Sequence, residues 1–399
     1  MAKRSARIAA RCIGGRPSFS AAARCDGLMM RPFTVVQLLP ALDSGGVERA
    51  VLEISAALVR DGQRAIVVSA GGRLVPELAR LGAEHITLDI GRKSLGSLRH
   101  LARLRRLFQN VDIVHARSRF PAWLAWFALK SMRAHKPRFV TTVHGLNSVS
   151  AYSAVMMRGE RVIAVSDSVR KHIVEHYPRT QSGHIRVIPR GLDPLLFPRG
   201  YRAPANWRPT FEVQYPQAAN LRWICLPGRG TRLKGHDDAL RLLADLRAGG
   251  ASVALVLLGA EQAGRGDYLD ELRREALRLG IAEQLVITPP RSDVRDVMSE
   301  SAFVLQLSRK PEAFGRTVVE ALNLGVPVLG WAHGGVGELL RELYPAGAVC
   351  LGDERALLKT AQEFLLHAPS APAFDHYRLH QMQAATLAVY RELLGETAQ

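Results

Sequence analysis

The sequence predicts an α/β protein in which two Rossmann-like, doubly wound domains face each other across a cleft. Its 399 residues exceed what one ordinary core accommodates, so two domains are expected. Short apolar strands alternate with segments of helical spacing along most of the chain, as parallel sheets covered by helices require. A Pro-containing stretch of low periodicity, residues 189–216, divides this alternation into two series.

The first series begins with a buried strand that is followed by a helix. Its expected strands are 34–39, 65–69, 85–88, 112–115 and 138–143, and its expected helices are 47–59, 75–81, 94–108 and 123–132. We place the domain that they form at residues 29–205.

The second series repeats this order after the linker. Its expected strands are 222–226, 253–258, 285–287, 303–307 and 326–330, and its expected helices are 237–248, 268–279, 294–299, 315–324 and 337–343. This domain is placed at residues 206–375, and the helical segment within 376–399 is expected to pack back on the first domain. Ligands of such sheets lie beyond the carboxyl ends of the strands, so the cleft is the expected site.

Residues 1–28 stand apart from both series. They contain Arg, Ser and Ala with a single acidic residue, and they lack an apolar core long enough for a secretory signal. A basic tail, a transit peptide and a start codon assigned too early, with translation beginning at Met29 or Met30, all fit this composition.

The overall composition is that of a globular protein, with 47% apolar and 23% charged residues and a mean hydropathy of −0.00. No apolar run is long enough for a transmembrane helix, and the composition excludes a fibrous or disordered chain. The four cysteines, Cys12, Cys25, Cys225 and Cys350, have neither disulfide nor metal spacing. We therefore expect no metal site and a reducing, cytoplasmic compartment.

The formal net charge of +18 indicates an anionic partner. Residues 1–28 carry a net +5, residues 29–205 carry +15 and residues 206–399 carry −2, so the positive field belongs to the first half. Nucleic acid, a membrane surface and a phosphorylated substrate all qualify. A recognisable nucleic-acid motif and a stacking platform are both missing, with aromatics at 6%, so no nucleic acid is expected.

The segment 92–106 carries much of this charge in the first half. An apolar row runs beside a basic one; the two rows are Leu95, Leu98, Leu101 and Leu104, and Arg99, Arg103 and Arg106. Such a helix can lie on an anionic membrane surface. The alternative is an ordinary packed helix with a solvated basic face.

Two carboxylates frame the most informative motif, residues 311–320. Glu312 is expected in a loop at the carboxyl end of a strand, where it can accept hydrogen bonds from sugar hydroxyls. Glu320 is expected on the following helix, where it can bind the paired hydroxyls of a ribose. Taken alone, both could equally be solvated surface acids.

A second motif, residues 228–235, follows a strand and precedes a helix. It places Arg229, Arg232 and Lys234 where helix N-terminal amides and cations together can hold a phosphate. It is not a Walker loop, because the Gly-Lys-Ser/Thr ending is absent, and the chain has no Gly-x-Gly-x-x-Gly element for NAD.

Taken together with Gly45-Gly46 and with the segment 333–338, these motifs resemble the retaining nucleotide-sugar glycosyltransferases of family four, which have the GT-B fold. The resemblance spans about residues 35–394. Within the family, the segments 309–320 and 114–119 look most similar to bacterial enzymes that build lipopolysaccharide core or other surface glycans.

The resemblance implies a role for each matching residue. Arg229 and Lys234 would hold the donor diphosphate, Glu320 the ribose and Glu312 the donor sugar. The remaining predicted donor-site residues are Gly45, Gly46, His144, Phe314 and Gly315. Catalysis is assigned to Glu312, His144, Arg229 and Lys234. The donor is expected to be a UDP-sugar, with no further cofactor.

Three positions depart from the family pattern. Ala313 replaces a usual Gly, Gly145 stands where an acid is common, and Arg190 occupies the usual Asn position of an Asn-Gly-Val-Asp turn. These departures leave the identity of the donor sugar open.

Charge develops on the departing diphosphate during sugar transfer, and protein cations can stabilise it without a metal. The chain has no Asp-x-Asp dyad, and the resemblance favours departure and attack on the same face. Arg117 and Arg119, just past a strand end, are the candidates for an anionic glycolipid or lipopolysaccharide-core acceptor. The expected location is peripheral, on the inner face of the cytoplasmic membrane. The alternatives on the same fold are a nucleotide-sugar 2-epimerase and a glycogen-type synthase.

Overall fold

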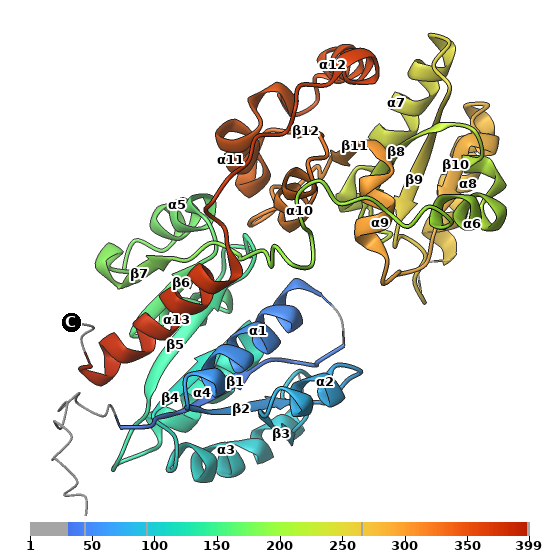
Figure 1. Ribbon diagram of the computed structural model, residues 1–399. Helices are drawn as coiled ribbons and strands as arrows, with labels where there is room; N and C mark the ends of the chain where they lie inside the picture. Colours follow the sequence, from blue (N-terminus) through green and yellow to red (C-terminus); the bar gives the residue numbers. More distant parts are fainter. Residues whose placement is uncertain (1–30, 44, 93–94, 265, 397–399) are drawn as a thin grey trace, which may run out of the picture. The chain divides into compact units, whose positions relative to one another are not determined.

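Two parallel β-sheets organise the chain (Figure 1). The computed structural model describes residues 31–43, 45–92, 95–264 and 266–396, so the expectations for residues 1–28 lie outside it. The strand order is β3-β2-β1-β4-β5-β6-β7 in the first sheet and β10-β9-β8-β11-β12-β13 in the second. Both orders reverse beside the first strand of the series, as doubly wound sheets do. The predicted fold class is confirmed.

The first sheet has seven strands with helices in the connections between them. The strands are β1 (Thr34–Leu38), β2 (Arg64–Ser69), β3 (Glu84–Thr87), β4 (Ile113–Ala116), β5 (Arg138–Val143), β6 (Arg161–Ala164) and β7 (Ile185–Val187). The helices are α1 (Gly46–Arg60), α2 (Val75–Arg80), α3 (His100–Phe108), α4 (Arg119–Lys130) and α5 (Asp167–His176). The central strands are buried because helices cover both faces of the sheet.

The second sheet is built in the same way. Its strands are β8 (Arg222–Pro227), β9 (Val253–Leu258), β10 (Leu285–Ile287), β11 (Ser301–Gln306), β12 (Val328–Trp331) and β13 (Ala348–Val349). The helices that follow the first sheet are α6 (Trp207–Gln214), α7 (His236–Ala248), α8 (Gly266–Arg278), α9 (Val294–Ser299), α10 (Arg316–Leu324), α11 (Gly334–Leu343), α12 (Glu354–His367) and α13 (Leu379–Leu394).

Three of the expected segments take a different form in the structure. The stretch 189–216, expected to be a linker without periodicity, contains α6, whose Pro209 lies in the first turn, where a missing N–H costs no hydrogen bond. The helix expected at 123–132 begins at Arg119, and Pro121 is tolerated for the same reason. The single helix expected at 94–108 is a 3₁₀ segment, Leu95–Arg99, followed by α3.

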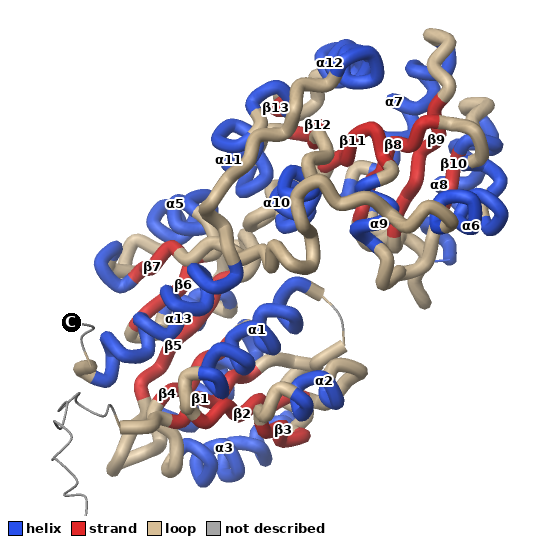
Figure 2. The backbone as a smooth tube through the Cα atoms, in the orientation of Figure 1, coloured by secondary structure: helices blue, strands red, loops and turns tan. Residues whose placement is uncertain are grey.

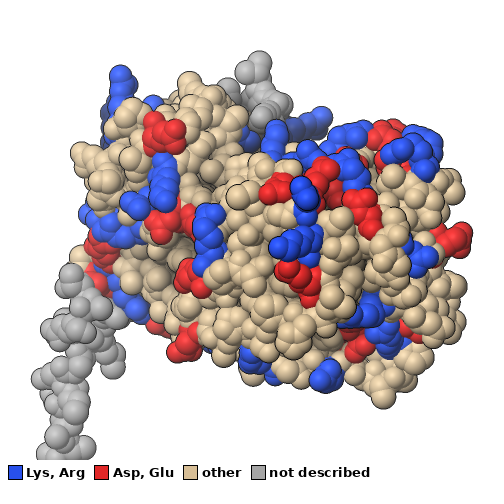
Figure 3. All heavy atoms as spheres, turned by 90° about the horizontal axis from the view of Figure 1, so that it is seen from above, with Lys and Arg blue, Asp and Glu red and all other residues tan. Residues whose placement is uncertain are grey.

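The apolar row of α3 packs into the protein. Leu104 and Phe108 are fully buried and Leu101 is half-buried, whereas Arg99, Arg103 and Arg106 are exposed. The side chains of Leu95 and Leu98 lie outside the described residues. Helix α3 therefore presents cations to solvent. On the face of the molecule that is drawn in Figure 3, Lys and Arg are scattered among Asp, Glu and uncharged residues. Within the described residues, the structure has no helix of the length and apolarity needed to cross a membrane.

The last helix, α13, packs against α1 and the first sheet (Figure 2). The Tyr390 hydroxyl lies 2.6 Å from His115 Nδ1, and Gln383 donates to the Glu53 carbonyl at 2.7 Å. Just before α13, an isolated parallel β-bridge pairs Arg378 with Leu192, which follows the last strand of the first sheet. These contacts hold α13 against α1 and against β4 of the first sheet.

Candidate functional site

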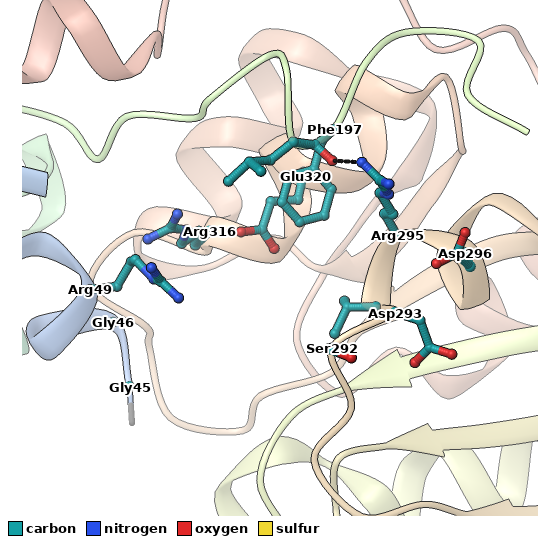
Figure 4. A pocket seen from close by; sticks show the side chains of 12 residues that line it. Gly45, Gly46, Arg49, Phe197, Ser292, Asp293, Arg295, Asp296, Arg316 and Glu320 are labelled. Carbon is teal, nitrogen blue, oxygen red and sulfur yellow. Dashed lines mark hydrogen bonds and ion pairs between the residues drawn. The ribbon is translucent and has the colours of Figure 1, made fainter. Parts of the chain in front are cut away.

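Two cavities of about 650 and 550 Å³ lie beyond the carboxyl ends of the central strands, and both are lined by Gly45 and Gly46. The larger one also contains Arg316 and Glu320 in its lining (Figure 4). The smaller one is lined by Arg229 and Lys234 from the loop after β8. Loops of both sheets therefore meet at the first turn of α1, where the topology of doubly wound sheets places ligands.

The loop after β8 depends on Gly235. This residue has φ of 72°, and a Cβ atom there would lie 1.9 Å from the Leu307 carbonyl oxygen. Only glycine allows the loop to pack against the end of β11 and turn into α7. Lys234 is thereby brought next to the loop that follows β11. Arg232 points elsewhere, to an ion pair with Glu271.

In the loop after β11, the Glu312 carboxylate accepts hydrogen bonds from two side chains. Lys234 Nζ lies 2.6 Å from its Oε1, and the Ser308 hydroxyl donates to the same oxygen. Burial acts to raise the pKa of Glu312, but the charge of Lys234 and these hydrogen bonds outweigh it, so the pKa is lowered. The carboxylate is therefore ionised at neutral pH and is paired with the lysine predicted to hold phosphate.

Phe314 and Gly315, the other predicted residues of this loop, lie on its far side. Phe314 is buried against Tyr377, at 5.6 Å between ring centroids. Gly315 has φ of 96° and is the N-cap of α10, where a Cβ atom would lie 2.8 Å from Val336 Cγ2. The structure thus places both residues as supports of the Glu312 loop, and they are absent from the linings of the two cavities.

Glu320 lies one turn into α10 and belongs to a buried ionic group. Arg316 Nε lies 2.8 Å from Glu320 Oε1, and Arg316 Nη2 lies 3.0 Å from Glu53 Oε1. Burial raises the pKa of Glu320, although Arg316 opposes this. Sequence reasoning gave Arg316 no role, although it lies within the motif 311–320, and it missed Glu53, which belongs to no recognisable motif.

The first turn of α1 is built for close approach. Gly45 has φ of 145° at the N-cap, and α1 begins at Gly46, so the free N–H groups of the first turn face the cavities. The Glu48 carboxylate lies over Gly45, where a Cβ atom would be 2.6 Å from its Oε2. Burial raises the pKa of Glu48, while the charges of Arg229 and Arg190 act to lower it.

His144 and Arg190 interact beneath this turn. Arg190 Nη2 lies 2.9 Å from His144 Nδ1 and donates to the Gly46 carbonyl oxygen at 3.0 Å. Burial and the charges of Arg190 and Arg117 hold the pKa of His144 well below its usual value. Burial also lowers the pKa of Arg190, to about 9. Sequence reasoning had singled out Arg190 only as a departure from the family turn.

The two predicted acceptor arginines have different surroundings. Arg117 is buried, and its guanidinium donates to Gln37 Oε1 and, more weakly, to Thr142. Arg119 donates to the Ser153 hydroxyl at 3.2 Å and lies 5.4 Å from the Tyr152 ring. Neither arginine is among the residues that line the two cavities. Their role in acceptor binding stays a prediction.

The lining of the smaller cavity also includes Leu258, Gln262, Pro290 and Arg291. Arg291 is held by both oxygens of Asp293 at 2.7 Å and lies 5.2 Å from the Phe211 ring. In the described part of the chain, no cluster of three or more His, Cys, Asp and Glu side chains could hold a metal ion.

Two family models match the chain. Residues 44–195 match the model described as Glycosyltransferase Family 4, and residues 208–376 match Glycosyl transferases group 1. The chain is 27% identical over 287 residues to a GDP-mannose-dependent alpha-(1-6)-phosphatidylinositol monomannoside mannosyltransferase of Mycolicibacterium smegmatis, with 68% of this chain and 72% of the relative covered. It is 29% identical over 199 residues to D-inositol 3-phosphate glycosyltransferase 1 of Catenulispora acidiphila, with 48% of this chain covered but only 46% of the relative's length.

Solved structures share the fold over nearly the whole chain. A glycosyltransferase from Rickettsia africae aligns with a TM-score of 0.79 and 25% identity, with 92% of this chain and all of that one covered. HepE of Anabaena, solved with UDP and glucose, aligns with a TM-score of 0.71 and 20% identity, covering 91% and 97%. WaaG, a glycosyltransferase involved in lipopolysaccharide biosynthesis, aligns with a TM-score of 0.64 and 16% identity, covering 90% and 98%. The chain therefore belongs to the family-four glycosyltransferases and is a sugar transferase with the GT-B fold.

Proposed function

We propose that the protein transfers a sugar from a nucleoside-diphosphate sugar, most simply a UDP-sugar, to an anionic lipid-linked or lipopolysaccharide-core acceptor, with retention at the anomeric carbon. One observation carries the proposal: Arg229 and Lys234 share a cavity with the first turn of α1, and Glu320 lies in the adjoining cavity. Cations and free N–H groups suit a diphosphate, and a buried carboxylate on a helix suits ribose hydroxyls.

The chemistry follows from where charge develops. As the bond to the anomeric carbon breaks, negative charge grows on the diphosphate, and Arg229, Lys234 and the α1 N-terminus stabilise it there. Glu312 lies beside Lys234 and accepts hydrogen bonds from the donor sugar. The departing phosphate assists removal of the acceptor proton on the same face of the sugar. No step in this scheme requires a metal ion.

The comparisons support a nucleotide-sugar donor and an acidic acceptor. HepE was solved with UDP and glucose, and the Mycolicibacterium relative is named for GDP-mannose and phosphatidylinositol monomannoside. The Catenulispora relative is named for inositol 3-phosphate. A GDP-sugar is thus the second donor to test. A glycogen-type synthase would not require so basic a first half.

The proposed location is the inner face of the cytoplasmic membrane. Positive charge is supplied by the exposed Arg103 and Arg106 of α3 and by Arg99 just before it, and α3 packs against α4. On α4, Phe127 is 44% exposed, and the Trp126 ring lies 4.5 Å from the guanidinium of Arg158. Aromatic rings beside cations are typical of surfaces at the lipid headgroup level.

The test is a panel of UDP- and GDP-sugars in which the release of nucleoside diphosphate is measured with and without truncated lipid-linked acceptors. The wild type is expected to release one nucleotide in an acceptor-dependent way, and folded Lys234→Ala is expected to lose most of this activity. Near wild-type turnover of Lys234→Ala would contradict the phosphate assignment. Binding to phosphatidylglycerol vesicles should fall when Arg99, Arg103 and Arg106 become Gln, and insensitivity to this change would contradict the membrane proposal.

A further inference from the structure

Two guanidinium groups near the cleft, that of the buried Arg117 and that of the half-buried Arg190, lack a carboxylate in direct contact. Among the described residues, no Asp or Glu oxygen forms an ion pair with Arg117 or Arg190; Arg316, by contrast, pairs with both Glu53 and Glu320. Removing a cation from water is costly unless an anion is bound next to it. A purely structural role at either position could be filled by a neutral amide side chain.

The contact between Arg190 and His144 fixes which nitrogen of the imidazole carries the proton. An arginine side chain only donates hydrogen bonds, so His144 Nδ1 must be the acceptor in the 2.9 Å contact with Arg190 Nη2. The neutral ring therefore carries its proton on Nε2. This Nε2–H is buried and has no hydrogen-bond partner among the described residues.

The same guanidinium retains unused donors. Arg190 Nη2 serves His144 and the Gly46 carbonyl oxygen, while Nε and Nη1 have no hydrogen-bond partner in the part of the chain that the structure describes. Arg117 adds to the positive potential, since its charge helps to lower the pKa of both Arg190 and His144. Glu53 and Glu48 act in the opposite direction on Arg190, but only from beyond contact distance.

We propose that Arg190 and the Nε2–H of His144 form a subsite for one anionic group, a carboxylate or a phosphate, carried by the transferred sugar or by the acceptor. The subsite adjoins Gly46, which lines both cavities, so its ligand lies next to the predicted position of the donor sugar. It is separate from Arg229 and Lys234, which serve the leaving diphosphate. The inference deepens the proposed function and rests on it for the identity of the reaction, but the subsite can be tested without turnover.

The binding test uses the full chain with ¹⁵N-labelled histidine and inorganic pyrophosphate present to occupy the diphosphate site. Glucuronate, glucose and inorganic phosphate are titrated while the His144 ring nitrogens are followed by NMR. We expect the Nε2–H tautomer, and we expect glucuronate or phosphate, but not glucose, to shift its signal. Arg190→Gln should weaken this binding at least about tenfold, because it removes charge-assisted hydrogen bonds, whereas Arg190→Lys should retain part of it.

Arg138→Gln is the matched control, since Arg138 forms only an exposed ion pair with Glu160. Arg190→Gln removes a half-buried charge that has no ion-pair partner among the described residues, so its melting temperature should not fall below that of the wild type. Three outcomes would overturn the subsite. Glucose could bind as tightly as glucuronate, no anion could shift the His144 signal in the wild type, or Arg190→Gln could weaken the binding of pyrophosphate as much as that of the other anions. The last result would assign Arg190 to the leaving group instead.

A second measurement identifies the source of the anion. Once the donor panel has shown transfer, kcat/KM is compared for Arg190→Gln with UDP-glucuronate against UDP-glucose, and with phosphorylated against dephosphorylated acceptor. A loss confined to the acidic donor identifies the transferred sugar as the source, and a loss confined to the phosphorylated acceptor identifies the acceptor. Equal losses with all four substrates would contradict the proposal. Absence of transfer in the wild type would count against the proposed function only, because the NMR titration is independent of it.

Discussion

Lys234 Nζ lies 2.6 Å from Glu312 Oε1, so an ion pair joins the loop after β11 to the loop after β8, whose Lys234 lines the smaller cavity. Both side chains are only about a quarter exposed, which places the pair out of full contact with water. In the proposed complex the lysine faces the diphosphate and the carboxylate faces the sugar. Each group therefore positions the other before a donor arrives.

Glu312→Gln should separate binding from transfer. The pKa of Glu312 is lowered, so the carboxylate is ionised throughout the neutral range, and the amide removes its charge without changing its shape. Lys234 then keeps its charge for the diphosphate. We expect nucleoside-diphosphate affinity to be unchanged or tighter by calorimetry, and transfer to fall by about 10²–10³-fold, as when one aimed polar group is lost from a transition state. Glu84→Gln, in an exposed pair with Arg64, is the control. An equal loss of nucleotide affinity would contradict the sugar-contact role.

Gly235→Ala should disrupt the loop after β8, which is proposed to bind the diphosphate, and Gly250→Ala provides a matched comparison. Both glycines have positive φ, 72° and 83°, but a Cβ atom at Gly250 meets nothing within 4 Å. Gly250→Ala should thus cost only the backbone strain of about 1–2 kcal/mol. At Gly235 the Cβ atom collides with the Leu307 backbone, so thermal unfolding should show a clearly larger fall in melting temperature, with loss of nucleotide binding. Similar falls for both variants would show that packing against β11 is unimportant.

Long apolar strands were predictable from the sequence because the pattern itself carries the information. Strand β9, with six apolar residues in succession, was placed to the residue at 253–258. Strand β13 has two residues, which are too few for any period to show, and it was missed together with α12. The segment β6-α5-β7 was missed as well, because its strands have only four and three residues and lie beside charged ones.

Site residues were predictable from the sequence only where all residues of a motif belong to one loop. The sequence predicted Arg229, Lys234 and Glu312 as site residues, because glycines and charged residues lie close together in the loops that contain them. The pairing of Arg316 with Glu53 joins positions 263 residues apart, and no local pattern records it. The contact of Arg190 with His144 likewise depends on two strand ends converging in the folded sheet.

Acid should destabilise the protein through its buried histidines. Burial lowers the pKa of His236 to about 4, and it lowers the pKa values of His115 and His144 as well. For a base with a lowered pKa in the folded state, the unfolded chain binds the proton first. Stability is then lost as pH falls from about 6.5, the unfolded value, towards the folded pKa, at about 1.4 kcal/mol per pH unit for each histidine.

His236→Gln isolates the contribution of one histidine to the pH dependence of the free energy of unfolding. Urea unfolding at pH 7 and pH 5 should show a smaller difference in the free energy of unfolding for the variant than for the wild type. Carboxylates contribute equally to both proteins and cancel in the comparison. Identical differences would mean that His236 takes up its proton as readily in the folded protein as in the unfolded chain.

Arg316 should control the protonation of the predicted ribose ligand. Burial already raises the pKa of Glu320, and Arg316, 2.8 Å away, is the charge that opposes it. Arg316→Gln removes that charge, so the pKa of Glu320 rises further and its carboxylate is protonated closer to neutral pH. A protonated carboxyl accepts ribose hydrogen bonds poorly. Nucleoside-diphosphate affinity should therefore decrease from pH 8 to pH 6 in Arg316→Gln, and more steeply than in the wild type.

The comparison ligand is the 2′,3′-dideoxy nucleotide, which lacks the hydroxyls that Glu320 is proposed to bind. With this ligand, the additional pH dependence of Arg316→Gln should vanish, because protonation of Glu320 no longer affects a contact. Arg295→Gln is the matched control: Arg295 lines the same cavity but donates to the Leu196 carbonyl oxygen rather than to a carboxylate. It should leave the pH profile unchanged. A pH-dependent loss that persists with the dideoxy nucleotide would place the ribose elsewhere and leave Arg316 as a link between α10 and α1 alone.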